Sequence, residues 1–240
     1  MKTWTILTHD WWQCYESGVK LLAERDDVVR YVPVSRWEPA PGEEIIFGAA
    51  RCPMLWGKIA QSEALCYETE NLLAPSPFRP LSIAARKIIT RPWLNYSREN
   101  SQVFGDCWYP VPPRTYRGPA GVATPKHFDV CFVGSVNERR AAVLRDLAVK
   151  GLRVAHPRSP IWGSNLADLE ARSRVVLNVH YYMPGVFESF RVLPALHRGA
   201  TVISEESVGG EGQDWCKCVP YETIVDEVLL TLGRSSAAAL

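Results

Sequence analysis

Short apolar runs alternate with amphipathic stretches through the second half of the chain. The runs suit buried strands, because each is short and rich in valine, isoleucine or leucine. They cover residues 130–133, 152–155, 175–179, 200–204 and 217–220. The stretches between them have apolar positions three and four residues apart, which indicates helices. Strands that alternate with helices predict parallel βαβ units in an open α/β sheet.

The helices of this half have recognisable ends. They are predicted over residues 137–148, 166–172, 189–198 and 222–232. Asn137 is a residue type that accepts backbone hydrogen bonds at a helix start. Gly151 and Gly199 follow two of the helices, as glycine does where the chain must turn left-handed after the last turn.

The first half repeats the pattern less regularly. Strands are predicted over residues 4–8, 28–34, 44–47 and 65–68, and helices over 14–24 and 59–65. Residues 83–90 are predicted to form a helix and then a strand, and a further helix starts at Asn95 or Ser97. Residues 109–125 contain five prolines and two glycines, a composition typical of a linker. We therefore expect two α/β domains, over residues 1–120 and 121–240, the first of them compact and trimmed.

Composition narrows the class of protein. The 240 residues are 47% hydrophobic and 22% charged, as in ordinary globular domains, and the formal net charge is +1. Basic and acidic residues are balanced in both halves, which argues against a large nucleic-acid-binding face. No apolar run reaches the roughly 18 residues of a membrane helix, and the N-terminus lacks a signal-peptide core. We expect a cytoplasmic protein without membrane insertion.

The seven cysteines are scattered, and Cys216 and Cys218 are the closest pair. A structural zinc site needs four ligands at defined spacing, and no second pair of ligands stands near this CxC. Free thiols and no metal site are expected.

Polar residues follow the predicted strands of the second half, where ligands of open parallel sheets bind. Gly134 and Ser135 form a turn ahead of Asn137, Arg139 and Arg140. A glycine turn, free helix amides and arginines are the elements of an anion site. The alternative is an ordinary βα turn with arginines facing the solvent.

Two further segments fall at the same edge. Asn178 and His180 end a strand, and either contact a ligand or serve as hydrogen-bonded structural residues. Glu188, Ser189 and Arg191 open a helix; Glu188 and Arg191 share a face there or form a surface ion pair. The motifs of dinucleotide-binding, P-loop, α/β-hydrolase and zincin proteins are absent from the sequence.

Carboxylates of the first half supply candidates for a general base. Asp10 follows the first strand, and Glu68 and Glu70 end another. Solvated or helix-capping carboxylates are the alternative at such positions. Nine tryptophans suit either a core or a platform for a sugar or base.

Taken together, these segments resemble GT-B glycosyltransferases, in particular CgeB-like, glycosyltransferase family 1 type proteins of bacteria and phages. Residues 129–140, 174–182, 187–191 and 195–205 are similar to the nucleotide-sugar-binding domain of that superfamily, and 67–72 and 95–100 to the preceding domain. The likeness covers roughly residues 65–230. It implies two facing Rossmann-like domains and transfer of a sugar from a nucleotide-diphosphate sugar to a hydroxyl acceptor, without a metal or another cofactor.

The resemblance also implies roles for individual residues. The donor would be bound by Gly134, Ser135, Asn137, Arg139, Arg140, Asn178, Glu188, Ser189, Arg191 and Glu205. Asp10, Glu70 and His180 are the candidates for catalysis. The acceptor would be a small molecule, a glycan or a hydroxylated nucleic-acid base.

The sequence departs from the family at Pro194, where many retaining enzymes carry a glutamate that holds the donor ribose. Ribose contact would then come from Glu188, Glu205, Glu206 or the backbone. Since proline has no N–H to donate, we expect the surrounding helix to start near Phe190. The chain is also short for this family. A non-catalytic nucleotide-binding module and a phage-type transferase that glycosylates a hydroxylated base are therefore the alternative functions.

Overall fold

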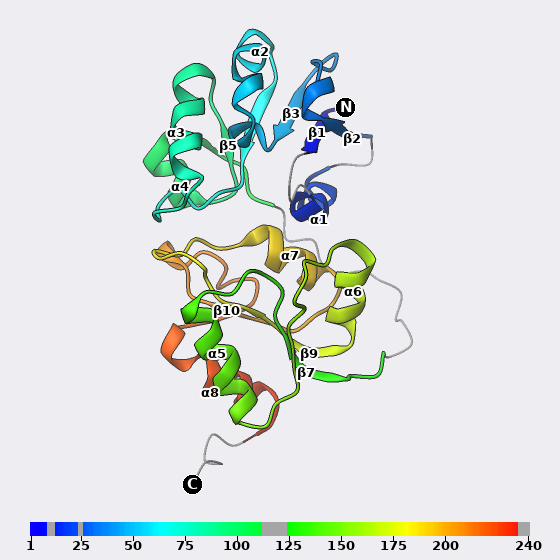
Figure 1. Cartoon of the computed structure of the whole chain (residues 1–240), viewed down its shortest axis with the longest axis vertical. Helices are drawn as coiled ribbons and strands as arrows, with labels where there is room; N and C mark the ends of the chain where they lie inside the picture. The colour runs from blue at the N-terminus through cyan, green and yellow to red at the C-terminus, as the bar shows by residue number, and fades with distance from the viewer. Residues whose placement is uncertain (9–12, 24–25, 112–123, 235–240) are drawn as a thin grey trace. The chain divides into compact units, whose positions relative to one another are not determined.

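The computed structural model describes residues 1–8, 13–23, 26–111 and 124–234 (Figure 1). The chain divides into two compact units. The first comprises Met1–Pro112 and the returning segment Tyr182–Phe190; the second comprises Pro113–Tyr181 and Arg191–Leu240. The boundary predicted at residue 120 lies outside the described residues. The pattern of hydrophobic residues does not predict that residues 182–190 belong to the first unit.

A fully parallel six-stranded sheet, in the order β2-β1-β3-β4-β5-β6, forms the first unit. Its strands are β1 (Thr3–Thr8), β2 (Val28–Pro33), β3 (Glu44–Phe47), β4 (Leu65–Glu68), β5 (Leu94–Asn95) and β6 (Cys107–Trp108). Its helices are α1 (Gln13–Leu22), α2 (Trp56–Gln61), α3 (Arg79–Ile88) and α4 (Arg98–Phe104). The α/β class predicted from the sequence is confirmed for this unit.

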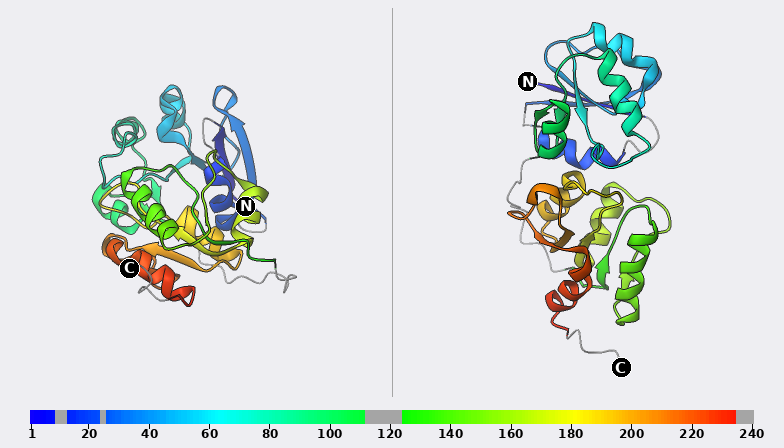
Figure 2. Two further views of the ribbon diagram at one scale, coloured as in Figure 1. Left: turned by 60° about the horizontal axis from the view of Figure 1, so that its bottom comes forward. Right: turned by 90° about the vertical axis from the view of Figure 1, so that its left-hand side faces the viewer.

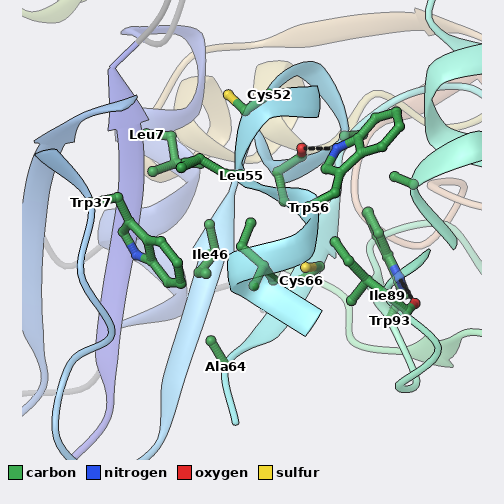
Figure 3. Close-up of a cluster of buried hydrophobic side chains, with 14 residues drawn as sticks. Leu7, Trp37, Ile46, Cys52, Leu55, Trp56, Ala64, Cys66, Ile89 and Trp93 are labelled. Atoms are coloured by element: carbon green, nitrogen blue, oxygen red, sulfur yellow. Dashed lines mark hydrogen bonds between the residues drawn. The ribbon is translucent and has the colours of Figure 1, made fainter. Parts of the chain in front are cut away.

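Tryptophans fill much of the core of the first unit (Figure 3). Trp37, Trp56 and Trp93 are buried, and the indole N–H groups of the last two donate to the backbone carbonyls of Ala49 (2.9 Å) and Ile89 (3.3 Å). A buried indole N–H needs such a partner, because an unpaired donor costs free energy. These three tryptophans therefore belong to the core and not to a ligand platform.

Some element bounds in this unit differ from those predicted. The helix predicted over 59–65 is α2, which begins and ends earlier, at Trp56 and Gln61. Residues 83–88 belong to α3, which begins at Arg79 with Pro80 in its first turn, and the next strand, β5, begins only at Leu94. Proline fixes φ near its helical value and lacks only an N–H that a first turn leaves unbonded, so it favours this early start.

The second unit contains a parallel five-stranded sheet in the order β11-β10-β9-β7-β8. Its strands are β7 (Phe128–Cys131), β8 (Val154–Ala155), β9 (Ser173–Asn178), β10 (Val202–Glu205) and β11 (Lys217–Val219). Its helices are α5 (Glu138–Val149), α6 (Gly163–Ala171), α7 (Ser189–His197), whose first two residues are in the returning segment, and α8 (Ile224–Thr231). All the predicted strands and helices of this half are present, with ends shifted by a few residues.

Helices α5 and α8 pack against each other over one face of this sheet (Figure 2). The core between these helices and the sheet includes Val175 and Leu177 of β9 and Val179 just after it. Because side chains alternate along a strand, Asn178 points to the opposite face. The alternation thus separates the apolar core from the polar residues described below.

The predicted helix ends are confirmed in the second unit, and α7 begins at Ser189, next to the start expected near Phe190. Asn137 caps α5, and Gly151 and Gly199 have φ of 74° and 80°. Pro194 lies in the second turn of α7, not the first. Its carbonyl still accepts a hydrogen bond from the Arg198 N–H (3.1 Å), so the helix continues past the proline. Among the described residues, no helix is both long and apolar enough to cross a membrane.

Candidate functional site

The carboxyl ends of β7, β9 and β10 lie next to one another in the second unit, because these are neighbouring strands of a parallel sheet. The chain leaves them at Gly134, His180 and Glu206, so the polar segments predicted after each strand meet at one edge. The site described here lies wholly within this unit.

Two guanidinium groups lie against the backbone at Gly134. This glycine has a φ of 149°, a value that side-chain-bearing residues rarely adopt. A Cβ placed on it would lie 3.1 Å from Nη2 of Arg191 and 3.4 Å from Nη1 of Arg140. The absence of a side chain therefore allows both arginines to approach the turn.

Hydrogen bonds fix the direction of both guanidiniums. Arg140 is only 2% exposed, and its Nε donates to the Val179 carbonyl (2.7 Å) while its Nη1 donates to the Ser135 carbonyl (2.8 Å). Nη1 of Arg191 donates to the side-chain oxygen of Asn178 (3.3 Å). These bonds to the backbone and to Asn178 orient both guanidiniums at the turn.

The start of α5 faces the same turn. The side-chain oxygen of Asn137 accepts from the backbone N–H of Arg140 (3.0 Å), and its amide donates to the Tyr181 carbonyl (2.8 Å). The cap thus joins the helix to the loop after β9. The N-terminus of a helix carries positive partial charge, which adds to that of the two arginines.

Arg139 is neutralised by a carboxylate. Both of its terminal nitrogens donate to Glu205, whose side chain is 3% exposed. This hydrogen bonding raises the pKa of Arg139. The guanidinium also stacks 3.8 Å from the ring centre of Tyr221. Of the two neighbouring arginines, Arg140 is therefore the one that lies against the turn at Gly134, and Glu205 links β10 to α5.

His180 is buried and held in place. Its backbone N–H donates to Glu205 (2.9 Å), and its Nε2 lies 3.1 Å from the Glu206 carbonyl and 3.3 Å from the Ser207 hydroxyl. A carbonyl only accepts, so Nε2 carries the proton in this arrangement. These contacts hold His180 between the segments that follow β9 and β10.

The remaining candidates belong to the first unit or lie outside the described residues. Glu188 and Ser189 belong to the segment that returns to the first unit. Ser189 is buried there, and its hydroxyl has no hydrogen-bond partner among the described residues. Asp10 lies outside the described residues.

Two carboxylates of the first unit are engaged by arginines. Glu68 pairs with Arg86 (2.9 Å), and Glu70 pairs with Arg51. Burial raises the pKa of Glu70, and the charge of Arg51 opposes this rise. The environment of Glu70 therefore shifts the titration of this carboxyl to higher pH.

Three contributors to the site were not predicted. Ser204 accepts a hydrogen bond from the Asn178 amide (3.0 Å), Ser207 contacts His180, and Tyr221 stacks on Arg139. The sequence did contain a signal for Ser204. Ser204 and Asn178 are polar residues within two apolar strands, and when such strands are neighbours, two such residues often form a hydrogen bond. The other two lie in loops, where polar residues are common. No group of three or more His, Cys, Asp or Glu side chains is arranged to hold a metal ion in the described part of the chain.

Comparison with known proteins gives relatives of no stated function. No family model matches the chain. It is similar to uncharacterized proteins of Acanthamoeba polyphaga mimivirus. One is 33% identical over 116 residues, which are 45% of this chain and 13% of that protein. A second is 31% identical over 116 residues, 46% of this chain and 38% of that protein. The chain thus covers well under half of these relatives.

Proposed function

We propose that the chain is a glycosyltransferase of the GT-B type, whose second unit binds the diphosphate of a nucleotide-diphosphate sugar. One observation carries the proposal: the guanidiniums of Arg140 and Arg191 converge on Gly134, just ahead of the α5 N-terminus. Two guanidiniums beside the N-terminus of a helix are groups that bind a diphosphate. The position at the carboxyl edge of a parallel sheet supports the same reading.

In this proposal the arginines stabilise the leaving group. Transfer of the sugar leaves negative charge on the nucleotide diphosphate, and oriented donors that are already in place stabilise it without reorganisation. Arg140 is fixed by backbone carbonyls and Arg191 by Asn178, so neither has to be reoriented. The acceptor hydroxyl would lose its proton to a carboxylate, with Asp10 and Glu70 as the candidates.

A thermal-shift screen tests the donor site. We expect UDP, GDP, CDP or ADP, or one of their sugar conjugates, to raise the unfolding temperature of the chain. A ligand at about 100 times its dissociation constant stabilises the folded state by about 2.7 kcal/mol. If none of these compounds shifts the transition, the donor site is wrong. If a nucleotide binds but no donor is hydrolysed or used in transfer, the chain is a non-catalytic nucleotide-binding module.

Replacing Arg191 with alanine tests the residue that contacts the turn. We expect the affinity for the nucleotide diphosphate to fall by about 1.5–3 kcal/mol, the range for hydrogen bonds to charged groups. Lysine should restore only part of it, since the planar two-pronged donor is lost. Titration calorimetry measures both variants. The control is Arg145→Ala, which removes an exposed arginine from α5. Equal affinity of Arg191→Ala and Arg145→Ala would remove Arg191 from the site.

A further inference from the structure

Cys216 and Cys218 bring two thiols together beside the candidate site. Cys218 lies in β11, and Cys216 lies in the bend just before it. Their sulfur atoms are 3.7 Å apart, and both residues are partly exposed. A disulfide bond is about 2.05 Å long, so closing it requires an approach of less than about 2 Å. A residue in a bend has the freedom to make this movement.

The sheet register places this pair at the end of a polar row. Cys218 is opposite Ser204 in β10, and Ser204 is opposite Asn178 in β9. Residues in register on neighbouring strands point to the same face. Asn178 in turn accepts from Arg191, so the row runs from the thiols to the candidate anion site.

The surroundings of Cys218 favour its thiolate. A hydrogen bond from Cys216 lowers the pKa of Cys218, with smaller contributions from His180 and Ser204 in the same direction. Burial and the charge of Glu206 oppose this lowering at Cys218. At Cys52 and Cys131 burial is the largest effect and raises the pKa to about 11. Because the thiolate is the nucleophile, Cys218 is set apart from these two cysteines.

We propose that Cys216 and Cys218 are a reversible thiol–disulfide pair, oxidised by exchange with a small-molecule disulfide such as oxidised glutathione. The Cys218 thiolate attacks one sulfur of that disulfide, forms a mixed disulfide and releases one glutathione. The Cys216 sulfur then loses its proton, attacks Cys218 and releases the second glutathione. Two thiols are oxidised and one disulfide is reduced, with both protons ending on the two glutathione molecules.

The position of Lys217 makes the product easy to recognise. The folded chain is incubated with excess oxidised glutathione, remaining thiols are blocked, and the chain is digested with trypsin. Cleavage after Lys217 separates peptides 199–217 and 218–234, each with one cysteine. We expect mass spectrometry to show the two peptides linked, or uncleaved and two hydrogens lighter, and a reductant to abolish this product.

Two variants act as controls. Cys216→Ser should lose the linked product completely and keep a glutathione on Cys218, since the second step has no attacking thiol. Cys107→Ser, which removes an exposed cysteine of the first unit, should leave the product unchanged. The proposal is overturned if the wild-type chain carries only glutathione adducts or blocked thiols at both positions. It is also overturned if the chain unfolded in denaturant forms the linkage as fast as the folded chain, since the fold then contributes nothing.

Discussion

Replacing Arg86 with alanine is expected to lower the free energy of unfolding of the first unit by about 3–5 kcal/mol, the cost of leaving buried charges without a partner. Arg86 lies between two carboxylates. Its Nη1 donates to Glu68 (2.9 Å) and its Nη2 to Asp106 (2.6 Å), and the side chains of these acids are 2% and 3% exposed. The guanidinium also lies 4.2 Å from the ring centre of Trp93.

The size of the effect follows from what remains after the substitution. Alanine removes the cation that pairs with both carboxylates, and it also removes the contact with Trp93. Tryptophan fluorescence during urea unfolding reports this unit, since Trp37 and Trp93 are in its core. Arg36→Ala, at an exposed position of the same unit, should change stability by less than about 0.5 kcal/mol.

A second variant separates charge from packing. Arg86→Met combined with Glu68→Gln and Asp106→Asn removes the cation and both negative charges, and it keeps a long apolar chain against Trp93. We expect it to recover part of the loss seen with alanine, since no buried charge is left unpaired. If Arg86→Ala is no less stable than Arg36→Ala, the ion pairs of Arg86 with Glu68 and Asp106 do not stabilise the unit.

The ion pairs of Arg86 are an example of contacts that the sequence alone does not predict. Arg86 is 18 residues from Glu68 and 20 from Asp106, and no local spacing links them. The elements that the sequence predicts well are those with long periodic patterns or recognisable ends, such as α5 between Asn137 and Gly151. Strands β5 and β6 have two residues each and were not predicted, whereas β8, equally short, is marked by the helix end at Gly151 just before it.

Some features of the candidate site could likewise be predicted from the sequence, and others could not. The apolar runs of the sequence show where the strands end. The turn at Gly134 and the polar end of β9 could therefore be predicted. The pairing of Arg139 with Glu205 joins residues 66 apart in sequence, so the different surroundings of Arg139 and Arg140 are visible only in the structure. The return of residues 182–190 to the first unit needed it as well, because a chain reversal between units leaves no periodic signal.

Replacing Gly134 with valine is expected to weaken nucleotide-diphosphate binding more than a thousandfold, about 4 kcal/mol. The first atom of the new side chain would lie 3.1 Å from Arg191 and 3.4 Å from Arg140, and valine extends further still. Both guanidiniums would have to move away from the turn. Since each charge-assisted hydrogen bond contributes about 1.5–3 kcal/mol, displacing two accounts for a loss of this size.

A matched control separates backbone strain from loss of the site. Gly151 has a φ of 74° and ends α5, and a Cβ there would meet nothing within 4 Å. Gly151→Val therefore introduces strain at the other end of the same helix without touching either arginine, and it should lose stability while keeping nucleotide affinity. Calorimetric titration of both variants, after circular dichroism has shown that each is folded, gives the comparison. A folded Gly134→Val chain with wild-type affinity would mean that the diphosphate binds elsewhere, because no anion could then depend on the approach of Arg140 and Arg191 to this turn.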